Sequence, residues 1–401
     1  MSGSAPGALG DPAPFPLGRE GPFDPPAALG ELNRRSPVTR VVLRGGDPVW
    51  LVTGWDAVRG ALAETRLSAA HTRAVNPAAP PAPSTPRTEE PQIPPGLFIA
   101  MDRPGHTAYR RAVAPALSTA AMRRIGPYVD RVVTGHVEAM VRGGAPADFV
   151  AAVALPVPAL VVGELIGVPV GDRDEFCHRS ATLLTVNDRG VHDYLRELIR
   201  RKRTEPGDDL ISHLLSAEVD RAPLPPEELA TICAMLLAAG HETVTSMLAL
   251  GLFVLLHEPD RYRALCREPD GADATVEELL RYLTVVQFGV FRVATEDLVL
   301  GGQRIAAGET VVASLAAANR DHRRFDAPDG FDAERDTPQH VAFGHGIHRC
   351  IGEHLARRQL VTTLRELTRR LPTLRLAAPA ADLPTSPDRA IYGVRELPVT
   401  W

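Results

Sequence analysis

The chain has 401 residues and a formal net charge of −5, with 44% hydrophobic and 23% charged residues. This composition is typical of a folded globular protein, and the lack of an overall basic field argues against a nucleic-acid partner. The four cysteines, at positions 177, 233, 266 and 350, are too few and too far apart for a disulfide scaffold.

The N-terminal residues have neither the basic start nor the apolar stretch of a signal peptide. The apolar run over residues 149–163 contains prolines and is shorter than the roughly 20 residues that a membrane span needs. We therefore expect a cytoplasmic protein without a membrane segment.

In chain order, a β-rich part comes first and a long helical part follows. Residues 38–54 predict a hairpin that turns at residues 45–47, and a helix begins at about Trp55. Residues 74–96 carry eight prolines and predict an irregular surface loop. This loop is either a disordered excursion or a functional lid, and the sequence favours neither. Residues 100–282 follow helical periodicity, with breaks at turn residues.

Strand signals return in the last third of the chain. Residues 284–315 contain short β runs, residues 350–371 predict a helix, and residues 385–401 are again strand-like. We expect a mainly α protein with a small β region to which both ends of the sequence contribute, organised as one domain over residues 1–401.

A long apolar helix is predicted over residues 225–256, and its middle is polar. Gly240, His241, Glu242 and Thr243 stand where a core helix would be apolar, and a buried carboxylate without a partner is costly. One interpretation is a polar pocket in which Glu242 and Thr243 handle protons. The other is a helix kink, with Thr243 bonded back to a carbonyl and Glu242 paired with a distant arginine.

The densest polar stretch places His345, His348, Cys350 and His354 within ten residues, just before the last predicted helix. These side chains are too crowded to converge on one zinc ion, because a helix starting at Cys350 brings only Cys350 and His354 onto one face. A single cysteine ligand fits better, since the free N–H groups at a helix start favour a thiolate.

Glycines at 344, 346 and 352 surround this cysteine. They let the backbone lie tightly against a flat, bulky group, and Gly344 and Gly346 can adopt positive φ. One thiolate beside close-packed backbone indicates a haem with a cysteine ligand. A buried inert cysteine before a helix is the alternative.

Four motifs together resemble one family. The run Phe343-Gly344-x-Gly346-x-His348-x-Cys350-x-Gly352 resembles the haem-ligand signature of cytochrome P450 monooxygenases. Residues 239–243, AGHET, look like the oxygen-activating motif of that family's long central helix. Glu278 and Arg281 look like its ExxR pair, and residues 101–111, MDRPGHTAYRR, resemble the haem-edge helix of bacterial members.

The resemblance implies a triangular helical body and a haem b (heme b) cofactor. Cys350 becomes the metal ligand, and residues at matching positions hold the haem: His106, Arg110, Arg292, His348, Phe343, Gly344 and Ala239. Glu242 and Thr243 become the catalytic acid and alcohol that deliver protons, while Glu278 and Arg281 become structural. His345 and His354 have no ligand role. One departure is Ala108, where family members often have an arginine.

The resemblance also suggests what the enzyme acts on. It places these residues in an apolar substrate pocket: Leu97, Phe98, Val290, Phe291, Ile391 and Tyr392. An oxidoreductase of this kind uses O2 and two electrons to hydroxylate or epoxidise a small hydrophobic molecule, such as an intermediate of secondary metabolism or antibiotic biosynthesis. Oxidative coupling or rearrangement is the alternative, as are a non-catalytic haem-binding protein and a zinc protein.

The chain has no room for a flavin or iron–sulfur domain, so the resemblance implies electrons from a separate ferredoxin and its reductase. Arg111, Arg349, Arg357 and Arg358 are candidates for docking an acidic ferredoxin. The abundance of arginine throughout the chain weakens the case for any one of them. We expect a monomer.

Overall fold

The computed structural model describes residues 14–15, 18–44, 46–70, 92–183, 189–219, 222–335 and 339–401. Gly45 of the expected hairpin turn and residues 74–91 of the proline-rich tract lie outside these ranges. The question of a lid in that tract therefore falls outside the described residues.

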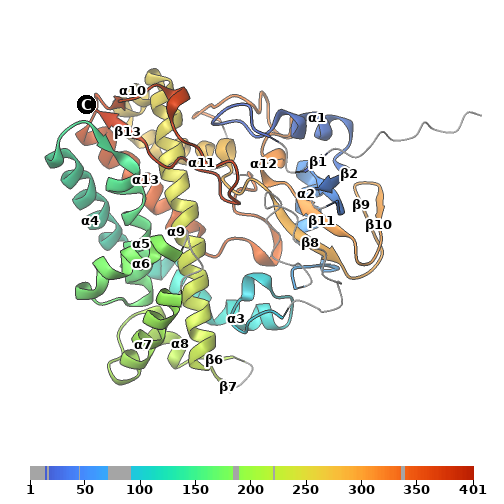
Figure 1. Ribbon diagram of the computed structural model, residues 1–401, viewed down its shortest axis with the longest axis horizontal. Coiled ribbons are helices and arrows are strands. Elements are labelled where there is room, and N and C mark those ends of the chain that lie inside the picture. The colour runs from blue at the N-terminus through green and yellow to red at the C-terminus, as the bar shows by residue number, and fades with distance from the viewer. Residues whose placement is uncertain are drawn as a thin grey trace, which may run out of the picture.

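Helices make up most of the described chain, and most of them gather on one side of the molecule, while the short helices α1, α2 and α12 lie beside the main sheet (Figure 1). The α-helices are α1 Ala27–Arg35, α2 Trp55–Ala63, α3 Gly105–Val113, α4 Thr119–Gly143, α5 Pro156–Ile166, α6 Arg173–Leu183, α7 Arg189–Thr204, α8 Leu210–Leu215, α9 Pro226–His257, α10 Pro259–Arg267, α11 Ala272–Leu283, α12 Leu315–Ala318 and α13 Glu353–Arg370. Short turns of other helix types are η1 Phe98–Ala100, η2 Ala114–Leu117, η3 Val150–Ala154, η4 Val170–Asp172, η5 Pro269–Gly271, η6 Gly346–His348 and η7 Ala380–Asp382.

The main sheet has strand order β1-β2-β3-β11-β8-β4 and joins distant parts of the sequence. Its hairpin pairs β2 with β3, while β11 lies parallel to β3 and antiparallel to β8. Three smaller sheets in the described part of the chain pair β9 with β10, β6 with β7, and β13 with both β12 and β5. The strands are β1 Pro14–Phe15, β2 Val38–Leu43, β3 Pro48–Val52, β4 Leu67–Ser68, β5 Ala147–Asp148, β6 Glu218–Val219, β7 Ala222–Pro223, β8 Val290–Ala294, β9 Leu298–Leu300, β10 Gln303–Ile305, β11 Thr310–Ala313, β12 Arg375–Leu376 and β13 Pro398–Thr400.

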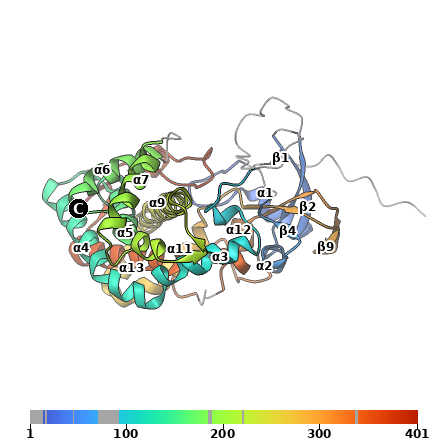
Figure 2. The same ribbon diagram turned by 90° about the horizontal axis from the view of Figure 1, so that it is seen from below.

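Helix α9 runs the length of the helical side and packs against helices α5, α7 and α13 (Figures 1 and 2). Pro226 occupies its first turn and Glu227 and Glu228 follow, which suits the positive end of the helix dipole. It is long and apolar enough to cross a membrane, but 72% of its most apolar stretch is buried inside the protein. Such burial is what a core helix shows.

The expected fold class is confirmed: the protein is mainly helical, with small sheets and a long central helix. Two local expectations differ. The helix predicted from residue 350 begins at Glu353, after Gly352 as its N-cap. The strand-like region 385–401 contains only β13 and isolated bridges, because Pro384 and Pro387 cannot donate to a strand ladder.

Candidate active site

The loop before α13 is a closed turn built on glycines. The backbone N–H of Cys350 donates to the carbonyl oxygen of Phe343 over 2.8 Å and closes the loop. Gly344 and Gly346 have φ of +72° and +73°, as their positions predict. A Cβ on Gly346 would also come within 2.4 Å of the Leu62 carbonyl oxygen at the end of α2, so only glycine fits there.

Cys350 is exposed at the surface of its loop, although many protein atoms surround its thiol. Burial raises the pKa of its thiol, and the Gly352 N–H with Arg110 and Arg357 opposes that shift only in part. The N–H at the helix start lowers the thiol pKa as expected, but desolvation outweighs it. A bound metal ion would remove the proton outright.

The other histidines of this stretch do not join Cys350. His354 is exposed on α13, and within the described ranges no three His, Cys, Asp or Glu side chains are arranged to share a metal ion. His348 instead stacks near His106 of α3, with ring centroids 4.2 Å apart.

Around that histidine pair lies a cluster of N–H donors. His106 and Arg110 come from α3, Arg292 from β8 and His348 from η6. Burial and the positive charge of Arg110 lower the pKa of His106 to about 4, and burial with Arg292 lowers that of His348 to about 3. Both rings are therefore neutral near pH 7, and each offers an N–H donor beside cationic guanidinium groups.

One member of this donor set, His106, is buried without a hydrogen-bond partner among the described residues. This holds for both of its ring nitrogens, although the ring is 2% exposed. The nearby carboxylate of Asp102 already accepts from Ser68 and, over 2.9 Å, from the backbone N–H of Ala69. A flat group carrying two carboxylates would satisfy these donors, so the residues fit the propionates of a haem.

The middle of α9 shows features of both earlier interpretations. The Thr243 hydroxyl donates to the Ala239 carbonyl oxygen over 2.7 Å, and Glu242 forms an ion pair with Arg389 at 2.8 Å. These are the contacts of the kink interpretation, but the helix is continuous through this region. Ala238 and Ala239 are exposed in an otherwise buried helix, which favours an open site beside them.

Burial raises the pKa of Glu242, and the guanidinium of Arg389 opposes that shift. The neighbouring His241 points to α5, where its Nε2 lies 2.9 Å from the Leu155 carbonyl oxygen. The carboxyl group and the hydroxyl of this turn are thus each fixed by one specific contact.

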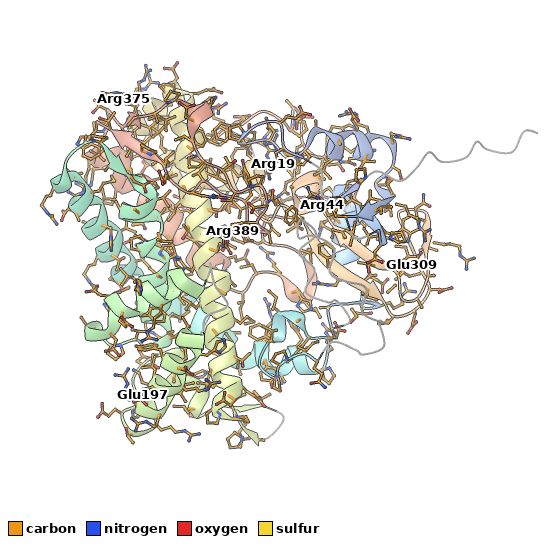
Figure 3. The ribbon with its side chains drawn as sticks, in the orientation of Figure 1. Arg19, Arg44, Glu197, Glu309, Arg375 and Arg389 are labelled. Atoms are coloured by element: carbon orange, nitrogen blue, oxygen red, sulfur yellow. The ribbon has the colours of Figure 1, made fainter. Side chains whose placement is uncertain are left out.

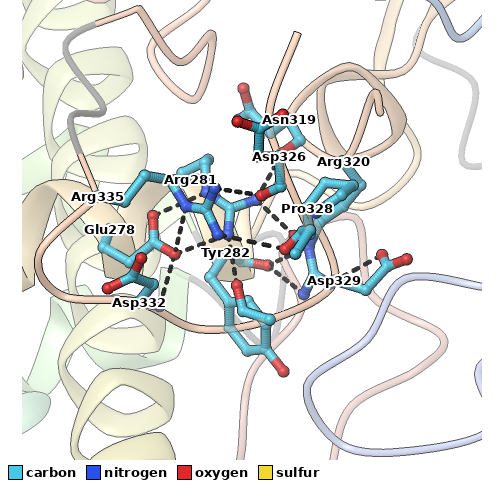
Figure 4. Close-up of polar contacts among 12 residues, drawn as sticks. Glu278, Arg281, Tyr282, Asn319, Arg320, Asp326, Pro328, Asp329, Asp332 and Arg335 are labelled. Atoms are coloured by element: carbon cyan, nitrogen blue, oxygen red, sulfur yellow. Dashed lines mark hydrogen bonds and ion pairs between the residues drawn. The ribbon is translucent and has the colours of Figure 1, made fainter. Parts of the chain in front are cut away.

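Glu278 and Arg281 form a fully buried ion pair that ties α11 to the chain before Cys350 (Figure 4). The guanidinium of Arg281 donates to the carbonyl oxygens of Asn319, Pro328 and Gly330 over 2.7–2.9 Å. The side chain of Asn319 in turn accepts from the Val341 N–H at 2.7 Å, two residues before the closed loop.

Sequence reasoning missed two acidic residues of the site. Glu277 accepts from Arg357 over 2.6 Å and lies 3.1 Å from His340; although burial alone would raise its pKa, these partners hold it at about 2. Asp102 lies beside the donor cluster. Glu277 directly precedes the ExxR motif, and Asp102 lies within the 101–111 motif. Their positions next to or inside these motifs could have identified both residues from the sequence.

The six residues expected to line a substrate pocket separate into two groups. Leu97, Val290, Phe291 and Ile391 are partly buried. Phe98 is 4% exposed and lies against His106, with ring centroids 6.2 Å apart. Tyr392 is 2% exposed and covered by Arg19, whose guanidinium carbon is 3.8 Å from the ring centroid, so it is a core side chain.

Three of the four candidate docking arginines already have acidic partners. Arg349 bonds Glu353 at 2.7 Å, Arg357 bonds Glu277, and Arg358 bonds Asp130 at 2.6 Å. Arg111 is exposed, with no ion pair in the described part of the chain.

Comparison with known proteins gives a consistent result. A family model described as Cytochrome P450 matches residues 185–372. Cytochrome P450 105C1 from Streptomyces sp is 42% identical over 399 residues, covering 97% of this chain and 99% of that protein. Pentalenic acid synthase from Streptomyces avermitilis is 41% identical over 398 residues, covering 97% and 98%. The crystal structure of a CYP105P1 mutant matches with a TM-score of 0.92 at 38% identity, covering 98% of this chain and 100% of that one.

Proposed function

This chain belongs to the cytochrome P450 family of haem monooxygenases, and we propose on that premise that Cys350 supplies the thiolate ligand of its haem iron. The uncovered sulfur of Cys350, the closed loop behind it and the start of α13 support this assignment. His348 is then a haem-edge residue, and His345 and His354 are not ligands.

His106, Arg110, Arg292 and His348 would bind the haem propionates. The observation that carries this proposal is the buried His106 ring, whose two nitrogens have no hydrogen-bond partner among the described residues, although the cationic Arg110 and Arg292 lie nearby. Phe343, Gly344 and Ala239 would contact the haem itself. The Glu278–Arg281 pair would act indirectly, because it fixes the chain that leads through Asn319 and Val341 into the loop of Cys350.

A bound haem supplies the activation of O2, and this chain must supply protons and hold the substrate. Glu242 and Thr243 are adjacent on α9, beside exposed Ala238 and Ala239. A partly buried carboxyl group whose pKa is raised holds a proton more readily than a free one, and a hydroxyl one residue away can pass it on. We assign these two steps to Glu242 and Thr243.

The substrate proposed is a small hydrophobic secondary-metabolite intermediate, which the enzyme hydroxylates or epoxidises. The partly buried apolar side chains of Leu97, Val290, Phe291 and Ile391 suit such a molecule. The name of a relative, pentalenic acid synthase, supports a product of this class. Electrons would come from a ferredoxin and its reductase in the cytoplasm, and exposed Arg111 is the best remaining docking candidate. We propose a monomer with its helical and β-rich parts in one domain.

The test of the iron ligand is the spectrum of the reduced, carbon-monoxide-bound protein. The wild type should give the Soret band of a haem with a thiolate ligand, and Cys350→Ala should lose it while a matched Cys233→Ala variant retains it. Survival of the band in Cys350→Ala would remove Cys350 from its role. A screen of small molecules for a low-to-high-spin shift then identifies the substrate class.

A further inference from the structure

The ion pair between Glu242 and Arg389 joins the centre of α9 to a segment near the C-terminus. Figure 3 shows Arg389 beside this helix. The two side chains are 25% and 38% exposed, and their charged atoms are 2.8 Å apart. Arg389 lies in the irregular stretch between the bridge residues Thr385 and Ile391, where no helix or strand fixes the backbone. Something else must hold this arginine in place.

Gln287 provides that support. Its backbone N–H donates to the Ala390 carbonyl oxygen at 3.2 Å, and its side-chain amide donates to the carbonyl oxygens of Pro387, at 3.2 Å, and of Arg389. The Gln287 side chain therefore bonds to the backbone on both sides of the tip of this loop. Since Gln287 is 8% exposed, water competes little for these bonds.

A partly buried arginine, Arg19, extends the same network. The Nε of Arg19 donates to the side-chain oxygen of Gln287 at 3.1 Å, and its Nη1 donates to the Asp24 carbonyl oxygen at 2.8 Å. Its guanidinium also lies over the ring of Tyr392. The amide of Gln287 is thus oriented by Arg19, because only its oxygen can accept and only its nitrogen can donate.

We infer that Arg389 is a positioning residue for the reaction, which holds the carboxyl group of Glu242 on α9 and is itself held by Gln287 and Arg19. The inference rests on the proposed role of Glu242 in proton delivery. Arg389 is the charged group that acts on this carboxyl among the described residues, and the adjoining His241 bonds to α5 instead. The network therefore sets both the position and the protonation of Glu242.

The sign of the effect follows from Coulomb attraction. A guanidinium next to a carboxylate favours its charged form, so removal of Arg389 moves the titration of Glu242 to higher pH. Arg389→Lys keeps the positive charge and should retain most of the wild-type behaviour. Gln287→Leu keeps Arg389 but releases the loop, so it should shift the titration in the same direction as Arg389→Gln, by less.

The first measurement is the pH titration of the Glu242 carboxyl band in the haem-loaded protein by infrared difference spectroscopy, with Glu242→Gln identifying the band. Arg389→Gln should titrate at higher pH than the wild type. Arg395→Gln, which removes an exposed arginine from the same segment, is the matched control and should not shift it. An unchanged midpoint in Arg389→Gln overturns the inference and leaves the role of Glu242 intact.

The second measurement separates the inference from the proposed function. Dithionite-reduced protein is mixed with O2, without added substrate, and its return to the ferric spectrum is followed across the neutral pH range. Glu242→Gln should flatten the pH dependence of this rate, and an unaltered profile would remove Glu242 from proton delivery. Arg389→Gln should keep the profile but displace it to higher pH, and a profile that stays in place would overturn the inference alone.

Discussion

Glu278 and Arg281 lie one helical turn apart on α11 and are joined by two hydrogen bonds, of 2.7 and 2.8 Å, with both side chains fully buried. The remaining donors of Arg281 and acceptors of Glu278 are satisfied too, by three carbonyl oxygens and by the Asp332 N–H. A buried charge pair is stable only when its polar atoms are satisfied in this way, so substitution of either partner costs much of the free energy of unfolding.

Glu278→Gln should therefore lower the free energy of unfolding by about 3–5 kcal/mol, the usual cost of breaking a buried pair, because Arg281 stays charged without its partner. Urea denaturation measures this change. The control is Arg365→Gln, which breaks an exposed pair between α13 and Asp273 of α11 and should change stability little. Equal effects of the two substitutions would contradict a structural role for Glu278.

How much of this arrangement could be read from the sequence depends on the range of the interaction. The i, i+3 relation of Glu278 and Arg281, the positive φ at Gly344 and Gly346, and the apolar character of α9 are local properties, and all three were predicted correctly. Helical spacing and turn chemistry suffice for them.

Contacts between distant segments could not be predicted in this way. No periodicity relates Glu242 to Arg389, so the arginine partner could be foreseen as a type of residue but not by position. Tyr392 was expected in the pocket from the resemblance to the family, but Arg19 covers its ring, and adjacent residues in an extended segment such as Ile391 and Tyr392 face opposite sides. The raised pKa of the Cys350 thiol could not be predicted for a similar reason, because burial is a property of the whole fold.

Arg292 should control how tightly haem is held. It is 8% exposed, and its Nη1 bonds only to the carbonyl oxygen of Phe291 among the described residues. A hydrogen bond to a charged group contributes about 1.5–3 kcal/mol, so Arg292→Leu should speed haem loss by roughly tenfold to a hundredfold. Transfer of haem to apomyoglobin measures the rate.

Two further variants sharpen that experiment. Arg292→Lys keeps the charge but not the planar fork and should give an intermediate rate. His345→Asn changes a residue of the same loop without an assigned ligand role and should leave haem loss as it is. If His345→Asn had the larger effect, the assignment of the haem-edge residues would be wrong.

His241 should make the protein less stable in mild acid. Burial lowers its pKa to about 4 from 6.5, so the unfolded chain takes up the proton first as the pH falls. Stability therefore decreases from about pH 6.5 toward pH 4, by up to about 3 kcal/mol for this residue. Urea denaturation across this range should show a shallower pH dependence in His241→Gln than in the wild type.

The control for this experiment is His354→Asn, which removes an exposed histidine and should leave the slope unchanged. A slope that is the same in His241→Gln and the wild type would mean that the pKa of His241 is not lowered in the folded protein, against its burial.

Thr243 should determine whether electrons are used for product or lost as hydrogen peroxide. Its hydroxyl is fixed by the 2.7 Å bond to the Ala239 carbonyl oxygen, so Thr243→Ala removes a positioned proton donor, while Thr243→Ser keeps one. A positioned hydroxyl contributes about 10²–10⁴ in rate, so Thr243→Ala should cut product formation at least about a hundredfold while NADPH consumption continues. The measurement is peroxide and product formed per NADPH, with a compound that shifts the spin state.

Thr245→Ala provides the matched control, because the Thr245 hydroxyl is buried on the same helix without a hydrogen-bond partner among the described residues. Equal coupling in Thr243→Ala and Thr245→Ala would mean that the proton reaches oxygen by a route that does not use this hydroxyl.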